Sequence, residues 1–495
     1  MKKQRLLKQS AVRAGAMTVV KLIGLVGRVM LTRMIGAEGI GLYQMVYSFY
    51  GFLLMLTGGL PTALAIITAK QPEQGRRLLG TVSAVLVIWG GIISLAVHGN
   101  ARVIAGALGH AGLVPALHGL APALFAVPLL ALLRGYLQGQ SRVGILALSE
   151  VAEQAVRVVL LLLIVNWLLP QGIERAVGGG LYATFAGALV SFALLTVYLI
   201  LKDKQNPPHP APYQKAPPVL RFVRTSLAIS LTRLFIPVSE LIDALLVPAR
   251  LLVAGYNQAQ ATAMFGVVYG MAALVAYTPT LVTGALSHTL TARIAAEWQR
   301  GNLKNFNRLS GLTLKVGWLW GVTSGLFLYR YAAELSFFIF GTEEADPVIR
   351  YLSAIPLIVG FRELTTSILW SIESRKAPVF GLFAGMICSI AAQYVLVGIP
   401  GFGYLGAAIA IIFMEAVSAL WNLNTLKKNG KIKKRALLMA LIDLCVLSAA
   451  VFTISGLSPS GRELQSSPWP FLFEAVVYFL TAGLYIGLRC IDARR

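Results

Sequence analysis

The sequence predicts an all-α polytopic membrane protein of about fourteen transmembrane helices, built as two six-helix lobes followed by two C-terminal helices. Composition is the first observation behind this class. The 495 residues are 57% hydrophobic and only 13% charged, with a mean hydropathy of +0.73, whereas soluble domains are about 25% charged. The second observation is that apolar runs of about 20 residues, long enough to cross a bilayer, recur from end to end.

The third observation is where the basic residues fall. With the N-terminus in the cytoplasm, most of the 43 Lys and Arg lie in the inner loops and flanks, as the positive-inside rule requires. We therefore expect a multi-pass protein of the cell membrane with both termini cytoplasmic. Topology and contact with the lipid bilayer explain the net charge of +23, so no nucleic-acid partner is expected. The predicted spans are roughly 14–35, 43–67, 78–98, 113–136, 145–169, 178–201, 226–250, 264–289, 309–329, 350–371, 378–398, 404–426, 436–456 and 470–490.

A polar, proline-rich segment divides the chain. Residues 202–218, KDKQNPPHPAPYQKAPP, favour neither helix nor strand and predict a cytoplasmic linker. The linker separates an N-terminal six-helix lobe, 1–201, from a C-terminal one, 219–426, and 427–495 holds two accessory transmembrane helices. The motifs LYQMVY at 42–47 and MFGVVY at 264–269 open equivalent spans. The lobes are thus expected to be parallel repeats about an axis along the membrane normal.

The sequence carries no pattern of enzymatic chemistry. It has no G-x-x-x-x-G-K-[ST] loop, no H-E-x-x-H and no C-x-x-C, so we expect neither an enzyme nor a catalytic residue, a metal site or a cofactor. Any energy for transport would come from a gradient of H+ or Na+ or from the membrane potential.

Cationic side chains inside the spans predict a polar cavity that favours an anion. They are Lys21, Arg28, Arg157, Arg233 and Arg362. A charge at bilayer depth costs on the order of 3 kcal/mol or more unless it meets a partner or a wet cavity. Lys21 and Arg28, seven residues apart, share one helical face. The functional interpretation is a ladder of cations for a phosphate-bearing substrate, with Arg233 from the seventh span. The alternative is pairing with acids on neighbouring helices.

The seventh span carries Arg233, Pro237, Glu240 and Asp243. Proline frees a backbone carbonyl and permits a kink. Glu240 and Asp243, with the kink at Pro237, are predicted to serve ion coupling or gating. The alternative is a salt bridge from Arg233 to Glu240, which are also seven residues apart, or to the first helix.

Other acids in the spans favour structural pairing. Glu153 and Arg157 are i,i+4 on the fifth span and are expected to form a structural ion pair. Glu415, Asp443 and Glu474 stand alone in apolar spans, so each is expected to be protonated or paired between helices.

Two segments carry a family resemblance. KLIGLVGRVMLTRMIGAEGIGLYQMVYSFYG at 21–51 and LRGYLQGQSRVGILALSEVAEQAVRVVLLLL at 133–163 resemble the polysaccharide-transporter branch of the multidrug/oligosaccharidyl-lipid/polysaccharide (MOP) exporter superfamily. The resemblance implies two six-helix lobes, a central cavity and alternating access. In relatives that flip a peptidoglycan precursor, a basic residue, a glycine and an arginine follow at three-residue steps. Here Lys21 and Gly24 match, and Gly27 takes the third position with Arg28 next to it.

The function that these observations favour is a flippase or exporter of a lipid-linked saccharide. The resemblance implies a polyprenyl-diphosphate carrier and a cell-wall or spore-cortex peptidoglycan precursor as the cargo, with cell-wall synthesis proteins as further partners. Two alternatives stay open. One is a cation-coupled multidrug exporter of the same fold, and the other is a non-transporting membrane scaffold for wall synthesis.

Overall fold

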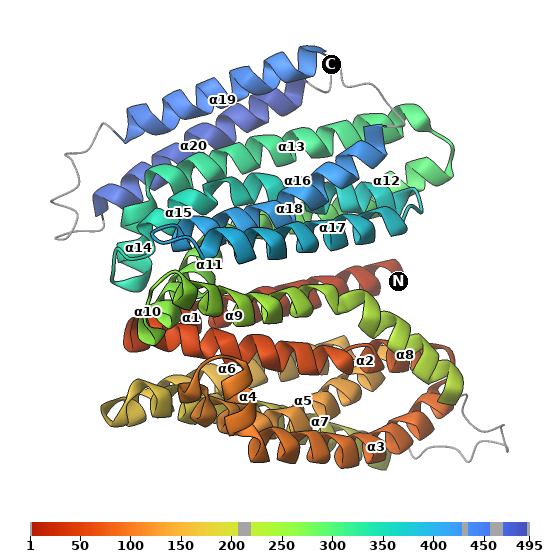
Figure 1. Ribbon diagram of the computed structural model, residues 1–495. Helices are drawn as coiled ribbons and strands as arrows, with labels where there is room; N and C mark the ends of the chain where they lie inside the picture. The colour runs from red at the N-terminus through yellow and green to blue at the C-terminus, as the bar shows by residue number, and fades with distance from the viewer. Residues whose placement is uncertain (1, 206–218, 428–433, 456–468, 493–495) are drawn as a thin grey trace. The chain divides into compact units, whose positions relative to one another are not determined.

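Every regular element of the described chain is helical, as the apolar runs predict (Figure 1). The computed structural model describes residues 2–205, 219–427, 434–455 and 469–492. Most of the predicted linker, 206–218, and residues 428–433 and 456–468 lie outside the described residues. Nine helical stretches of the described part are long and apolar enough to cross a membrane. The prediction of an all-helical, multi-pass membrane protein is confirmed.

The helices fall into two compact units, Met1–Pro248 and Ala249–Arg495. The predicted lobe boundaries stay a prediction. The main helices of the first unit are α1 (Lys2–Leu56), α2 (Leu60–Lys70), α3 (Pro72–Gly99), α4 (Ala101–Ala107), α5 (Val114–Gly139), α6 (Val143–Leu168), α7 (Ile173–Gln205), α8 (Val219–Arg233) and α9 (Phe235–Val253), of which α9 crosses into the second unit.

The second unit contains two π-helical segments, η3 (Gly266–Ala272) and η5 (Gln393–Val397). Its α-helices are α10 (Gln258–Phe265), α11 (Ala273–Tyr277), α12 (Thr280–Gln299), α13 (Leu303–Arg330), α14 (Ala332–Phe340), α15 (Asp346–Tyr351), α16 (Ile355–Ser371), α17 (Lys376–Ala392), α18 (Gly403–Lys427), α19 (Lys434–Ile454) and α20 (Trp469–Asp492).

Glycine and proline set the breaks between helices. Gly36 has φ 66° inside α1, a conformation that side chains with a Cβ rarely adopt, so α1 is two helices joined at a kink. The next break lies at Gly58 and Gly59, and Pro61 then stands in the first turn of α2, where a missing N–H costs no helical hydrogen bond. The break at Leu234 is comparable, because Pro237 falls in the first turn of α9.

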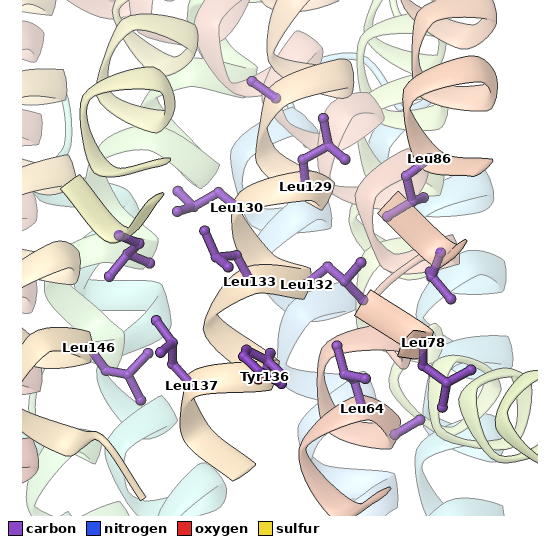
Figure 2. Packing of buried hydrophobic residues seen from close by; sticks show 14 of the residues in the cluster. Leu64, Leu78, Leu86, Leu129, Leu130, Leu132, Leu133, Tyr136, Leu137 and Leu146 are labelled. Carbon is purple, nitrogen blue, oxygen red and sulfur yellow. The ribbon is translucent and has the colours of Figure 1, made fainter. Parts of the chain in front are cut away.

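Leucine packing holds the first unit together (Figure 2). Leu64 of α2, Leu78 of α3 and Leu132 of α5 are fully buried and face one another across three helices. Phe222 of α8 closes the same cluster at 1% exposure. Where α5 crosses α7, a Cβ on Gly119 would lie 2.0 Å from the carbonyl oxygen of Gly178. These helices therefore approach backbone to backbone, as small residues permit in membranes.

Helices α19 and α20 pack on α13 in the second unit. The aromatic residues Phe327, Tyr331, Phe471 and Tyr478 join α13 to α20, and Val451 and Ile454 of α19 belong to the same cluster. The hydroxyl of Tyr478 donates to the Thr323 carbonyl at 3.0 Å, which satisfies a buried polar group that lipid could not. The two C-terminal helices thus belong to the packed body of the second unit.

Candidate anion-binding site

Arg28 is held in the first unit by the second half of its own kinked helix. The kink at Gly36 folds α1 back, so that Gln44 Oε1 accepts a 2.5 Å hydrogen bond from Arg28 Nη2. The guanidinium carbon lies 5.3 Å from the centre of the Tyr43 ring, within the range of a cation–π contact. The Nε atom of Arg28 is buried and has no hydrogen-bond partner among the described residues. Arg28 therefore keeps donor capacity for a ligand.

A stacked pair of tyrosines links Arg28 to a second arginine. The rings of Tyr43 and Tyr47 lie 5.1 Å apart at 14°, as the i,i+4 spacing on one helix allows. Arg157 of α6 donates from Nη1 to the Tyr47 hydroxyl at 3.3 Å and from Nη2 to Gln154 Oε1. Two guanidinium groups thus contact one aromatic stack, Arg28 at the Tyr43 ring and Arg157 at the Tyr47 hydroxyl. Such planar donors bind phosphate through paired hydrogen bonds.

The glycines of the first helix bring α6 close to it. A Cβ on Gly24 would lie 2.7 Å from Gln154 Nε2, and one on Gly27 would lie 2.5 Å from Val158 Cγ1. Larger residues at either position would push away the helix that carries Arg157. The glycine that matches the family pattern, Gly24, therefore has a packing role beside the arginines.

Glu153 has a different partner from the one predicted. It forms an ion pair with Arg134 Nη1 of α5 at 2.6 Å, and Ser149 accepts from Arg134 Nε at 3.0 Å. The i,i+4 spacing made Arg157 the expected partner, but α5 supplies a competing guanidinium, and Arg157 turns to Gln154 and Tyr47 instead. Arg157 is therefore part of the arginine–tyrosine cluster of Arg28, Tyr43, Tyr47 and Arg157.

The break at Leu234 separates Arg233 from the residues expected on its face. Arg233 ends α8 and donates from Nη1 to the Gly58 carbonyl and to Thr62 Oγ1, both at 3.3 Å. Glu240 lies on α9 and interacts electrostatically with Arg28. The shared helical face expected for Arg233 and Glu240 is therefore absent, because two helices replace the single predicted one.

The other predicted residues lie at varied depths. Lys21 is exposed on α1, two turns before Arg28. Asp243 is buried in α9 at 8% exposure, and Pro237 is buried in the first turn of that helix. The structure thus brings Arg28 and Glu240 together, and it places Arg233 against the α1–α2 break.

Arg362, the cation predicted within a span of the second unit, is neutralised locally. Arg362 Nε of α16 donates to Glu415 Oε2 of α18, and the Tyr277 hydroxyl donates to Glu415 Oε1 at 3.2 Å. Asp443 of α19 likewise pairs with Arg489 of α20 at 2.7 Å. These pairs, with the 2.9 Å bond from Tyr331 to Glu474, match the expectation that the isolated acids pair between helices. Arg362 is therefore a structural cation.

The tyrosines and Gln44 are the contacts that sequence reasoning missed. Tyr43 and Tyr47 entered the sequence-based prediction only as part of the repeat motif LYQMVY. Their i,i+4 spacing in an apolar span, 15 and 19 residues after Arg28, was an available signal for an aromatic face beside a cation.

A family model for polysaccharide biosynthesis proteins matches residues 6–264, which is more than half of the chain and covers this whole cluster. The chain belongs to the polysaccharide biosynthesis protein family. The resemblance to the polysaccharide branch of the MOP superfamily, a branch of transporters and not of enzymes, is confirmed at the level of this family.

Two curated relatives in this family come from Bacillus subtilis (strain 168). Stage V sporulation protein B is 27% identical over 468 residues, covering 91% of this chain and 90% of that protein. Lipid II flippase MurJ is 24% identical over 461 residues, covering 87% of this chain and 84% of the relative.

Solved structures of the superfamily share the fold. A lipid II flippase MurJ in an inward closed conformation superposes with a TM-score of 0.73 over 98% of this chain and all of that chain, at 13% identity. An inward-facing MATE multidrug resistance transporter gives a TM-score of 0.68 over 85% of this chain and 99% of that chain, at 16% identity. The family member described here therefore has the MurJ- and MATE-like transporter fold.

Proposed function

We propose that this transporter moves a polyprenyl-diphosphate saccharide, a cell-wall or spore-cortex peptidoglycan precursor, across the cytoplasmic membrane by alternating access. The arginine–tyrosine cluster carries the proposal. It holds two guanidinium groups within predicted spans, and Glu240 is a carboxylate that interacts electrostatically with Arg28. A diphosphate must lose its water to cross roughly 30 Å of hydrocarbon. Arginine donors that are already in place offset that loss.

The relatives point to the same class of cargo. One is named a lipid II flippase and another a sporulation protein, so a lipid-linked wall precursor is the cargo that we assign to this chain. Lys21 and Arg233 are proposed to assist Arg28 with the headgroup. With such a cargo, the protein is expected to act together with cell-wall synthesis proteins.

Outward movement of an anion needs no ATP. An inside-negative potential drives each negative charge outward by about 2.3 kcal/mol per 100 mV. Glu240 and Asp243, on the helix that begins at the Pro237 break, are proposed to take up a H+ or Na+ ion during the return step. Protonation of Glu240 would remove the charge that competes with phosphate for Arg28.

The proposal includes the full predicted topology of fourteen spans, two parallel six-helix repeats and cytoplasmic termini. Equivalent contacts in the two units support the repeat. Arg157 Nη1 donates to the Tyr47 hydroxyl at 3.3 Å in the first unit, and Gln393 Nε2 donates to the Tyr269 hydroxyl at 3.4 Å in the second. Tyr47 and Tyr269 are the last residues of the two repeat motifs.

The test is flipping of a labelled polyprenyl-diphosphate saccharide in proteoliposomes. Arg28→Gln and Arg157→Gln are each expected to slow flipping at least tenfold, because a guanidinium–phosphate pair is lost. Arg102→Gln removes the same charge from an exposed position on α4 and serves as the matched control. Wild-type rates equal to those of empty vesicles would end the proposal.

The same variants separate the alternatives. A cation-coupled drug exporter would keep or increase its efflux of cationic dyes when Arg28 loses its charge. A non-transporting scaffold would support wall synthesis in cells equally well with either glutamine. Loss of flipping in both variants, with the control unchanged, is the result that favours the lipid-linked cargo.

A further inference from the structure

We propose that Arg250 forms a second binding site for a phosphate-bearing group, located entirely within the second unit. Its chemistry is that of the arginine–tyrosine cluster, namely a guanidinium group held over an aromatic ring with unused N–H donors. The site is separate from every residue assigned above. Of the two ligands considered below, only the diphosphate of the cargo rests on the proposed function.

The Arg250 side chain is fixed by contacts that leave its hydrogen-bond donors free. Its guanidinium carbon lies 4.3 Å from the centre of the Tyr394 ring. It also packs on Gly398, where a Cβ would come within 2.3 Å of Nη2 and 2.9 Å of Cζ. The Nε atom is buried without a hydrogen-bond partner among the described residues. The ring and the glycine thus hold the guanidinium in place, and neither accepts an N–H hydrogen bond in the ring plane.

Arg250 differs from the other membrane arginines of its unit in having no acid. Arg362 pairs with Glu415, and Arg489 pairs with Asp443 at 2.7 Å. No carboxylate pairs with Arg250 in the part of the chain that the structure describes. A part-buried cation without a counter-charge is costly. A bound anion that is not part of the protein would supply the missing counter-charge of Arg250.

The sequence repeats the arrangement of the first unit around this residue. Arg28 precedes Tyr43 by 15 residues and Tyr47 by 19, and Arg250 precedes Phe265 and Tyr269 by the same numbers. The rings of Phe265 and Tyr269 stack at 4.7 Å, as those of Tyr43 and Tyr47 do at 5.1 Å. Arg250 is therefore the counterpart of Arg28 in the second repeat.

The backbone around the site is unusual. Tyr394 lies in the π-helical η5, and Gly398 is its C-cap. Phe265 leads into the π-helical η3, where Gln393 Nε2 reaches the Tyr269 hydroxyl. Short π-helical segments re-aim side chains and are frequent at functional sites. Here the wider turn of η5 presents the Tyr394 ring to Arg250.

Two phosphate-bearing occupants fit this chemistry. One is the diphosphate of the cargo as it leaves the proposed path, since the proposed orientation places Arg250 at the outer end of its span. The other is the headgroup of an anionic phospholipid. Both would use the planar donors of the guanidinium, so the experiment needs one arm for each.

The first arm measures binding of farnesyl diphosphate to the full-length protein in phosphatidylcholine nanodiscs by calorimetry. The wild type is expected to bind two molecules per chain. Arg250→Gln should weaken one binding event at least tenfold, whereas Arg28→Gln should affect only the other. Arg250→Lys should fall between wild type and glutamine, because an ammonium keeps the charge but not the fork.

The second arm counts phosphatidylglycerol molecules that stay bound in native mass spectrometry. Loss of one bound lipid in Arg250→Gln, without change in diphosphate binding, would support the site and identify the headgroup as its occupant. If Arg250→Gln does not fold, as judged by its melting curve, Gly398→Ala replaces it. The added Cβ displaces the guanidinium while its charge remains, and the same event should weaken.

The result that overturns the proposal is unchanged binding in both arms for Arg250→Gln and Gly398→Ala. The two proposals fail separately. If Arg28→Gln leaves diphosphate binding and flipping intact while Arg250→Gln removes one event, the proposed function falls and the second site stands.

Discussion

The buried pair of Arg362 and Glu415 offers a quantitative test of which cations are structural. The side chains are 16% and 7% exposed, and the Tyr277 hydroxyl donates a further bond to Glu415. Removing one partner of a buried pair leaves the other charge uncompensated, at a cost of about 3–5 kcal/mol. We therefore expect Glu415→Ala to lower the free energy of unfolding by that amount.

Removing both charges together should cost much less. In Arg362→Met/Glu415→Leu, apolar side chains of similar volume fill the space, and such replacements of a buried pair are often neutral. The double-mutant cycle of wild type, Arg362→Met, Glu415→Leu and the double variant should therefore show a coupling energy of at least about 3 kcal/mol, because each single variant leaves one orphaned charge and the double variant leaves none. Unfolding by SDS titration in mixed micelles measures these four proteins and Glu415→Ala.

Flipping assays on the same variants connect stability to function. Because the charge of Arg362 is neutralised by Glu415, the double variant should keep more than half of the wild-type flipping rate. A well-folded double variant that no longer flips would show that Arg362 serves the cargo and refute this reasoning. Equal stability of Glu415→Ala and wild type would refute the buried-pair energetics.

Two further predictions concern helix packing. Gly27→Ala should destabilise the protein by about 1–3 kcal/mol, because its Cβ would lie 2.5 Å from Val158 Cγ1. Adding Val158→Ala should restore much of the lost stability in SDS titrations. The absence of any rescue would show that α6 does not contact α1 at Gly27. Asp443→Ala should loosen α20, because it removes the partner of Arg489 and of the Tyr485 hydroxyl, both at 2.7 Å. In a background where Cys388 and Cys445 are serine, a membrane-permeant maleimide should then label Cys490 several-fold faster. An unchanged labelling rate would contradict this.

Linear patterns predicted the fold class well. Apolar run lengths identified a multi-pass helical protein, and the two family segments placed it in the right superfamily. They also marked Arg28 as a cation within a span, which is where it lies. These properties depend on distance along the chain, and the rise of a helix converts residue number directly into depth.

Partner choice was less predictable, as Glu153 shows. Its i,i+4 neighbour Arg157 is close along the helix, yet Arg134 of α5 takes the carboxylate. The seventh span shows a related difficulty. The prediction treated it as one helix with a kink at Pro237, but the chain breaks at Leu234, and so Arg233 and Glu240 belong to different helices. A break of a few residues changes the direction of every later side chain.

The sequence by itself determined that this chain is helical, membrane-embedded and carries cations inside apolar helices, because hydropathy and charge are properties of local composition. Only the tertiary structure decided which of those cations are neutralised, as Arg362 is, and which keep donors free, as Arg28 and Arg250 do. That difference depends on which neighbouring helix places an acid or a ring beside each guanidinium, and the packing of distant segments determines it.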